Sequence, residues 1–249
     1  MVPLLEFNNV SCDSDDVLEN VSFAVYPGEN AMFFGVEGSG LKIVTPLILS
    51  VEGLYDGDIL YKGRVIRSLD YLGKLSYKNN IGYVHGDYGL ISNMNVEQNI
   101  SLRLEYYSEY SIADIREITE RLMRELGIID KRKARPVELT SSQIFRTAYG
   151  RAVAHDPDLL IIEHAFMGQS PLNIRSFMDV LKKRVENPDK SVIFVTYEPQ
   201  KFVDFADTFH MLYRGRIVFT GTRQEFLESD NPYLVQYRNI SLQGPMDII

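Results

Sequence analysis

The stretch Glu29-Asn-Ala-Met-Phe-Phe-Gly35-Val-Glu-Gly38-Ser-Gly40-Leu-Lys42 joins a short apolar run to a glycine-rich loop. A nearly continuous apolar run that ends in glycine is typical of a buried central strand. The residues that follow, 42–54, read KIVTPLILSVEGL and have the pattern of an apolar helix. A strand, a glycine-rich loop and a helix in this order form the context of the phosphate-binding loop G-x-x-x-x-G-K-[ST].

The glycines of this loop match the phosphate-binding pattern, but its two chemical positions do not. Leu41 stands where a lysine normally reaches the phosphates, and Lys42 stands where a hydroxyl normally ligates Mg²⁺. Glycines at these places let backbone N–H groups close around a phosphate, and they also occur in turns with a purely structural role. The candidate phosphate-loop residues are Gly35, Gly38, Ser39, Gly40, Leu41 and Lys42.

Strand and helix patterns alternate on both sides of the loop. Period-two alternation over residues 4–10 and 21–27 predicts two antiparallel strands before it. Hairpin turns are predicted at Lys62-Gly63 and Arg214-Gly215, and the tail from Ser229 is expected to be irregular. Buried strands are predicted at 81–84, 159–162 and 191–197, and helices at 111–127, 141–155 and 173–187. Short buried strands between helices imply an α/β fold with a mostly parallel sheet.

Composition excludes several classes of protein. The 249 residues include 26 basic and 34 acidic side chains, which gives a net charge of -8 and argues against a nucleic-acid partner. Cys12 is the only cysteine, so an internal disulfide and a cysteine-based metal cluster are excluded. The N-terminal residues do not resemble a signal peptide, and no stretch approaches the roughly 20 apolar residues of a membrane helix. These features predict a soluble intracellular protein.

Two further stretches are landmarks of the same kind as the glycine loop, because each lies at the boundary of a predicted helix or strand. Leu139-Thr-Ser-Ser-Gln143 precedes a predicted helix, and Leu159-Leu-Ile-Ile-Glu163-His164-Ala165 ends a predicted strand. With these landmarks the chain resembles, over nearly its whole length, the ATP-binding subunits of ABC transporters. The resemblance implies a RecA-like P-loop core, an N-terminal antiparallel β-subdomain and an inserted α-helical subdomain. The implied boundaries are 1–87 and 156–225 for the core with its β-subdomain, 88–155 for the helical subdomain, and 226–249 for a C-terminal tail.

The resemblance assigns family motifs to positions of this sequence, and most of the motifs are altered. Residues 139–143 correspond to the signature loop L-S-G-G-Q, so that Ser141 and Ser142 replace its glycines and Gln143 is kept. The aromatic residue that stacks on adenine in the family corresponds to the region of Cys12-Asp13. The other correspondences are Glu163-His164 with the end of the Walker B strand, Gly86 with the Q-loop glutamine, Gly168 to Pro171 with the D-loop, and Tyr197 with the switch histidine.

These departures predict a subunit without catalytic residues. The positions Glu163, His164, Tyr197 and Gly86 lack the family's groups, and the loop lacks its lysine. Phosphoryl transfer depends on positioning and charge stabilisation, so several such losses predict hydrolysis near background. We expect ATP or ADP to bind weakly and expect no metal site and no Mg²⁺. Two alternatives remain: a slow ATPase in which Glu163 holds metal and His164 is the base, and a nucleotide sensor that binds without hydrolysis.

Two residues after the glycine loop suggest local rearrangements. Lys42 and Glu163 are hypothesised to form a salt bridge that fills the vacant metal position; the alternative is that Lys42 extends into solvent. Pro46 lies inside the expected helix, where proline breaks a backbone hydrogen bond, and it predicts a displaced helix start.

A narrower resemblance concerns the transported cargo. Residues 81–104 and the ending 231–237 with Gly244-Pro245 are similar to the ATPases of Mla-type lipid transporters, which serve MCE proteins. In that family the tail embraces the partner subunit. The implied function is a catalytically degenerate subunit, a pseudo-ATPase, that acts as scaffold or regulator. The implied partners are a multispanning permease, a second copy or a paralogous ABC subunit, and an MCE protein. The implied location is cytoplasmic, peripheral on the inner face of the cytoplasmic membrane.

Overall fold

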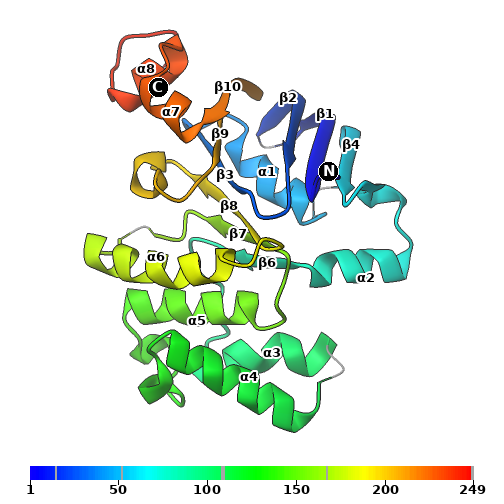
Figure 1. Ribbon diagram of the computed structural model, residues 1–249, viewed down its shortest axis with the longest axis vertical. Helices are drawn as coiled ribbons and strands as arrows, with labels where there is room; N and C mark the ends of the chain where they lie inside the picture. Colours follow the sequence, from blue (N-terminus) through cyan, green and yellow to red (C-terminus); the bar gives the residue numbers. More distant parts are fainter. Residues whose placement is uncertain (15, 52, 108–109, 167, 248–249) are drawn as a thin grey trace. The chain divides into compact units, whose positions relative to one another are not determined.

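The computed structural model describes residues 1–14, 16–51, 53–107, 110–166 and 168–247. The chain forms two compact units, one built from Met1–Lys78 with Ser191–Ile249 and the other from Asn79–Lys190 (Figure 1). Within the described ranges, no helix combines the length and the apolar character needed to cross a membrane.

The first unit begins with an antiparallel sheet in the strand order β2-β1-β4-β5. Its strands are β1 Leu5–Asp13, β2 Val17–Val25, β4 Asp56–Tyr61 and β5 Arg64–Val65. Lys62 and Gly63 turn the β4–β5 hairpin with φ angles of 48° and 74°, as predicted for a tight turn of this kind. The prediction of an antiparallel N-terminal β-subdomain is therefore confirmed.

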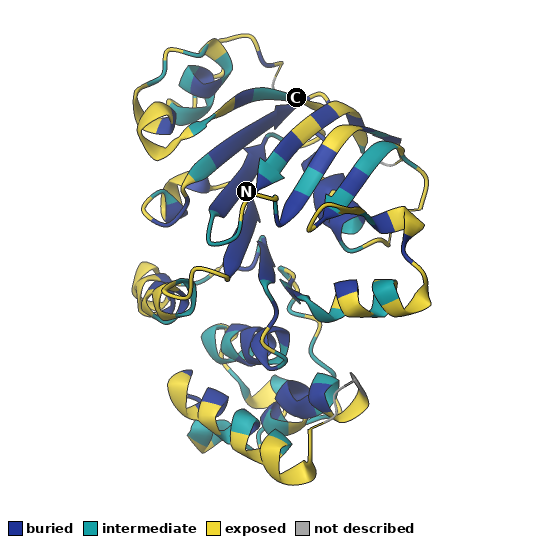
Figure 2. Cartoon of the chain, turned by 45° about the vertical axis from the view of Figure 1, so that its right-hand side comes forward, coloured by how far each residue is buried: buried dark blue, intermediate teal, exposed yellow. Residues whose placement is uncertain are grey.

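A second set of strands in the same unit carries the glycine loop. β3 Asn30–Gly35 pairs in parallel with β8 Ser191–Thr196 on one side and with β9 Thr208–Tyr213 on the other, and β10 Arg216–Thr222 is antiparallel to β9. Every residue of β3 and β8 is buried, as the dark blue central strands of Figure 2 show. The buried apolar run before the loop is thus a central strand, and the α/β prediction is confirmed.

Helix α1, Leu41–Ile48, starts directly after the loop, so the prediction of a displaced helix start was wrong. Gly40 adopts a φ of 93° and ends the loop, and the helix follows without a gap. Pro46 lies one turn farther on, where its missing N–H removes a backbone hydrogen bond without moving the first turn.

Helix α7 Arg223–Glu228 ends before Ser229, and helix α8 Pro232–Arg238 lies within the C-terminal tail, so the prediction of an irregular tail from Ser229 was wrong. The side chain of Asn231 caps α8 by accepting hydrogen bonds from the N–H groups of Tyr233 and Leu234. Pro232 occupies the first helical position, where its fixed φ favours a helix start. The dipeptide Asn-Pro was the sequence signal for this helix.

The residues after α8 pack back onto their own unit. The amide of Gln236 donates to the carbonyl of Met246 at 3.0 Å, and the N–H of Met246 donates to Gln236 Oε1 at 2.8 Å. Arg214 of the β9–β10 turn forms an ion pair with Asp247 at 2.6 Å. The tail is therefore tied to the strands that carry the glycine loop.

The second unit contains a parallel strand pair and several helices. β6 Ile81–Val84 pairs with β7 Leu159–Glu163. The helices are α3 Val96–Tyr107, α4 Ile112–Glu125, α5 Ser141–Val153 and α6 Pro171–Val185, with α2 Tyr71–Asn79 ending where this unit begins. The predicted boundaries of the helical subdomain, 88–155, enclose α3, α4 and α5 and stay a prediction.

Capping boxes start three of these helices. Ser111, where the predicted helix begins, caps α4 together with Asp114, and Thr140 caps α5 together with Gln143. Helix α3 was not predicted from the sequence, although Asn95 and Gln98 exchange the same pair of hydrogen bonds at its start, at 3.0 and 2.9 Å.

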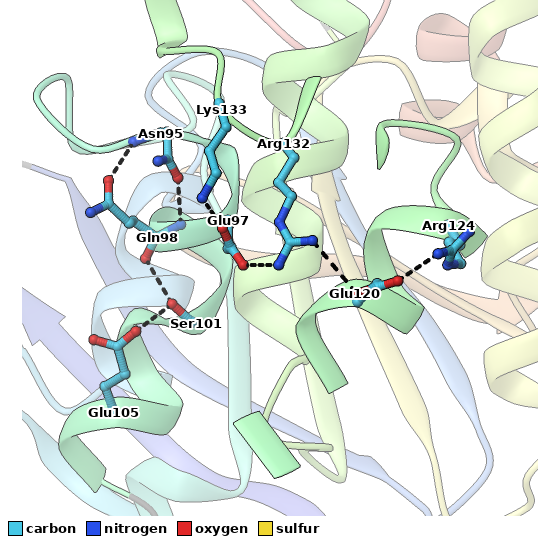
Figure 3. Close-up of polar contacts among 9 residues, drawn as sticks. All are labelled: Asn95, Glu97, Gln98, Ser101, Glu105, Glu120, Arg124, Arg132 and Lys133. Atoms are coloured by element: carbon cyan, nitrogen blue, oxygen red, sulfur yellow. Dashed lines mark hydrogen bonds and ion pairs between the residues drawn. The ribbon is translucent and has the colours of Figure 1, made fainter. Parts of the chain in front are cut away.

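An ion-pair network joins the start of α3 to the basic run 131–135 (Figure 3). Glu97 binds the guanidinium of Arg132 and, at 2.7 Å, the ammonium of Lys133. Arg132 also contacts Glu120 of α4 at 3.5 Å, and Glu120 binds Arg124. The hydrogen bond from Arg132 lowers the pKa of Glu97 to about 2.

We predict that Glu97→Gln lowers the free energy of unfolding by about 1 kcal/mol at pH 7, the range of a partly exposed pair. Because the pKa of Glu97 is lowered in the folded state, its contribution is present above the unfolded value of 4.5 and disappears as the pH falls toward about 2. Urea unfolding of the unsubstituted chain and of Glu97→Gln, at pH 7 and at pH 3, measures whether their stabilities become more similar at the lower pH. Glu117→Gln, at an exposed position of α4, is the control and should leave stability unchanged. If the stability difference between Glu97→Gln and the unsubstituted chain is as large at pH 3 as at pH 7, the ionised carboxylate of Glu97 is not its source.

Candidate functional site

The phosphate-loop candidates divide into a buried part and an exposed tip. Ser39, Gly40 and Leu41 are buried, and Leu41 is only 1% exposed. Glu37 and Gly38 form the exposed tip of the loop. The loop therefore presents a carboxylate at its tip, and the side chain at the lysine position points into the core.

The backbone amides of the loop bind a carboxylate of this same chain. Asp16, in the turn between β1 and β2, accepts the N–H of Gly40 with both carboxylate oxygens, each at 3.0 Å. The N–H of Lys42 donates to the same carboxylate at 3.4 Å, and the N–H of Val17 donates at 3.2 Å. An anion at a helix N-terminus is stabilised by the free N–H groups and the helix dipole. Asp16 thus stands where these amides would meet a phosphate.

Close backbone packing holds Gly40 against two turns. A Cβ at Gly40 would come within 2.4 Å of the carbonyl oxygen of Val17 and 3.2 Å of the Cα of Gly215. The N–H of Gly215 donates to the carbonyl of Ser39 at 2.9 Å, and Glu19 donates to the carbonyl of Gly215 at 2.8 Å. The β1–β2 and β9–β10 turns therefore fix the end of the loop, and only glycine fits there.

The tail reaches the start of the loop. The hydroxyl of Tyr237 donates to the carbonyl of Tyr197 at 2.7 Å and lies 3.1 Å from the carbonyl of Gly35. Burial raises the pKa of Tyr237 well above its ordinary value, which keeps the hydroxyl protonated as a donor. The backbone at the predicted switch position is thus joined to the phosphate loop through α8.

In the second unit, Tyr83 binds the carboxylate at the end of β7. Glu163 is 6% exposed and accepts the hydroxyl of Tyr83. Burial, followed by the hydrogen bond to Glu163, raises the pKa of Tyr83, so the phenol remains a proton donor. One carboxylate oxygen at the end of the strand that the resemblance assigns to Walker B is therefore engaged by a side chain of the same unit.

Gly86 packs against the residue that follows Glu163. A Cβ at Gly86 would lie 3.1 Å from the carbonyl oxygen of His164, whose own φ is 47°. His85 binds Asp87 at 2.7 Å across Gly86, and this hydrogen bond lowers the pKa of Asp87. A longer side chain at position 86 requires His164 to shift by a few tenths of an ångström, so the two departures from the family pattern are sterically linked.

The signature-loop candidates form the first turn of α5. The side chain of Gln143 accepts the N–H of Thr140 at 3.0 Å, so its oxygen is used within the cap. Ser141 is exposed and Ser142 is half-buried. Residues 140–143 thus form the start of α5, and both hydrogen bonds of its capping box are present.

Each unit brings together part of the predicted site. The first unit places Gly35 beside the backbone of Tyr197, and the second places Gly86 beside His164. Cys12 is buried, and its thiol donates to the carbonyl of Leu54 at 3.4 Å. The proposed pair of Lys42 and Glu163 links different units and stays a prediction.

Three residues that engage the site were missed by the sequence analysis. Asp16, Tyr83 and Tyr237 are 24, 80 and 202 residues from the partners they bind in the loop and at Glu163. The position of Asp16, 24 residues before Gly40, gives no local signal that its side chain binds the loop. No local pattern marks either tyrosine.

Comparisons of sequence identify a transporter family. A family model described as "ABC transporter" matches residues 18–166. The methionine import ATP-binding protein MetN 1 of Staphylococcus aureus is 24% identical over 239 residues, 94% of this chain and 70% of that protein. The intermembrane phospholipid transport system ATP-binding protein MlaF of Haemophilus influenzae is 22% identical over 245 residues, 98% of this chain and 93% of that protein.

Solved structures share the fold. CbiO1 of Clostridium perfringens, described as part of an ABC transporter complex, superposes with a TM-score of 0.81 at 20% identity, covering 96% of each chain. A dimeric ATP-binding cassette bound to ADP and Pi superposes with a TM-score of 0.78 at 20% identity, covering 88% of this chain and 98% of that one. The RecA-like fold of these proteins is thus the fold of this chain.

Proposed function

Because the chain belongs to the ABC transporter family, we propose that it is an ABC transporter subunit that docks on a membrane permease without hydrolysing ATP. Its role is that of a scaffold or regulator of the transporter. The location that follows is peripheral, on the inner face of the cytoplasmic membrane. The second ATP-binding subunit of the transporter is another copy of this chain or a paralogous ABC subunit.

The occupied phosphate loop is the observation that carries this proposal. The amides of Gly40 and Lys42 bind Asp16, and Leu41 brings no positive charge to the phosphates. Loss of a single preorganised oxyanion donor from an enzyme typically lowers the rate by roughly 10²–10³-fold. The signature loop adds serine Cβ atoms where the family has glycine, so a partner chain would also receive an altered surface.

The residues that stand at the family's metal-binding positions in the sequence do not fit Mg²⁺. Magnesium prefers oxygen ligands in octahedral geometry, whereas Lys42 supplies an ammonium and Gly86 supplies no side chain. Glu163 keeps a carboxylate, but Tyr83 donates to one of its oxygens. No catalytic step is therefore assigned to this chain.

Lipid is the cargo that we propose for the transporter. MlaF, a phospholipid-transport protein by name, aligns over nearly the whole of both chains, whereas the alignment with MetN 1 leaves part of that protein unmatched. A lipid transporter of this class would supply an MCE protein as a further partner. Affinity purification from the native cell should recover a multispanning permease together with an MCE protein, and recovery of an amino-acid permease instead would contradict this cargo.

Phosphate release and nucleotide titration test the absence of hydrolysis. The purified chain should release phosphate from ATP at the background rate, with or without Mg²⁺, and His164→Ala should change nothing. Magnesium-dependent release that His164→Ala abolishes would establish the slow ATPase instead. Saturable ATP or ADP binding without release would establish a nucleotide sensor.

A further inference from the structure

We propose that Asp16 is a built-in anion of the phosphate loop: it occupies an anion site that the loop retains and thereby excludes free phosphate groups from it. The proposal rests on the non-hydrolysing function above and deepens it, because it identifies what takes the place of the nucleotide phosphate.

The contacts of Asp16 are those of a bound anion. Both carboxylate oxygens lie 3.0 Å from the N–H of Gly40, and one of them lies 3.4 Å from the N–H of Lys42. These amides sit at the end of the glycine loop and in the first turn of α1. Such N–H groups are the usual donors to a phosphate at a helix N-terminus.

The charge of the loop matches a carboxylate. A helix N-terminus supplies roughly half a positive charge, and a phosphate loop normally adds its lysine and a metal ion to balance a polyphosphate. Here Leu41 is buried and uncharged, and the exposed charges of Glu37 and Lys42 offset each other. A single carboxylate is balanced by such a loop, whereas a polyphosphate is not.

The fold holds Asp16 in position to compete. Its carboxylate also accepts the N–H of Val17 at 3.2 Å, and the adjoining backbone of Val17 packs directly on Gly40. A group fixed by the fold competes at an effective concentration on the order of millimolar or above. A free phosphate must displace this carboxylate or approach it against like charge.

Isothermal titration calorimetry with pyrophosphate and inorganic phosphate tests the proposal on the full chain. Asp16→Ala should bind pyrophosphate at least about tenfold more tightly than the unsubstituted chain, which is a difference of about 1.4 kcal/mol. Asp16→Asn keeps the side-chain shape and a single acceptor oxygen, and it should give an intermediate affinity. Asp70→Asn is the matched control: Asp70 caps α2 through the N–H of Gly73 at 2.8 Å, and its substitution should leave pyrophosphate binding unchanged. Equal affinities of Asp16→Ala and the unsubstituted chain, or binding by neither, would overturn the proposal.

Nuclear magnetic resonance of the unsubstituted chain gives a second readout that does not depend on folding of the variants. The amide signals of Gly40 and Lys42 should not move when pyrophosphate is added, whereas saturable movement at millimolar concentration would overturn the proposal. Both readouts contain no ATP, so they are distinct from the phosphate-release assay. Hydrolysis by the chain would reject the proposed function, while an unchanged pyrophosphate affinity of Asp16→Ala would reject the role of Asp16.

Discussion

Gly40→Ala should lower the free energy of unfolding by roughly 3–5 kcal/mol, an exceptional value for one methyl group. The residue has a φ of 93°, which costs an L side chain about 1–2 kcal/mol. The added Cβ would also lie 2.4 Å from the carbonyl oxygen of Val17 and 2.7 Å from Cδ2 of Leu18, so the β1–β2 turn must move. Urea unfolding measures the loss.

Gly38→Ala separates the two contributions to this loss. Gly38 has a φ of 69°, but its Cβ would meet no heavy atom within 4 Å. We therefore expect a cost of about 1–2 kcal/mol, from the backbone conformation alone. Equal losses for the two variants would show that contact between the loop and the turn does not determine stability. Because the same turn presents Asp16, Gly40→Ala should also disturb the amides that bind its carboxylate.

Phe34→Ala should lower the free energy of unfolding by an amount comparable to that of Gly40→Ala. It should also selectively reduce the hydrogen-exchange protection of the tail. Phe34 is fully buried in β3 and makes edge-on contacts with Phe226 of α7 at 5.5 Å and with Tyr237 of α8 at 5.3 Å. Truncation of a buried phenylalanine typically costs about 3–5 kcal/mol. Hydrogen exchange should also show reduced protection of 232–238, because the tail loses its contact with the central strand.

Phe194→Ala is the matched control for the tail. Phe194 is 1% exposed in β8 and packs on Phe202 at 5.2 Å and Phe205 at 5.4 Å, which are outside the tail. Its substitution should lower the free energy of unfolding by a similar amount. The hydrogen-exchange protection of 232–238 should then fall no more than global stability does. Unchanged tail protection in Phe34→Ala, relative to this control, would contradict the coupling of the tail to β3.

Elements with strong local signals were predicted from the sequence. The hairpin turns at Lys62-Gly63 and Arg214-Gly215 adopt left-handed φ angles, which these glycines accept without strain. The capping box of Ser111 and Asp114 forms within four residues of chain. The continuous apolar run 30–35 became the buried strand that its composition requires. For the turns and the cap, the interactions that form the element lie within a few residues of one another. For β3 only the apolar composition is local, because its pairing partners β8 and β9 lie far along the chain.

Weaker local signals were misread. Helix α8 has seven residues, and little apolar periodicity is visible over so short a length. Its stability depends instead on the cap at Asn231 and on burial of Leu234, which is fully covered by the rest of the unit. Pro46 does not displace the start of α1, because the conformation of Gly40 positions the first turn of the helix.

The sequence by itself determined the order of strand, glycine loop and helix, the family, and the loss of the lysine and hydroxyl from the loop. These properties depend on residue identity and near-neighbour spacing, which can be read along the chain. Only the tertiary structure determined what the altered loop binds: Asp16 at its amides and the hydroxyl of Tyr237 at the carbonyl of Gly35. Folding brings together groups that are 24 and 202 residues apart, and the burial of backbone polar groups then requires a partner for each. Where leucine replaces the phosphate-binding lysine of the loop, that partner can be a carboxylate of the same chain.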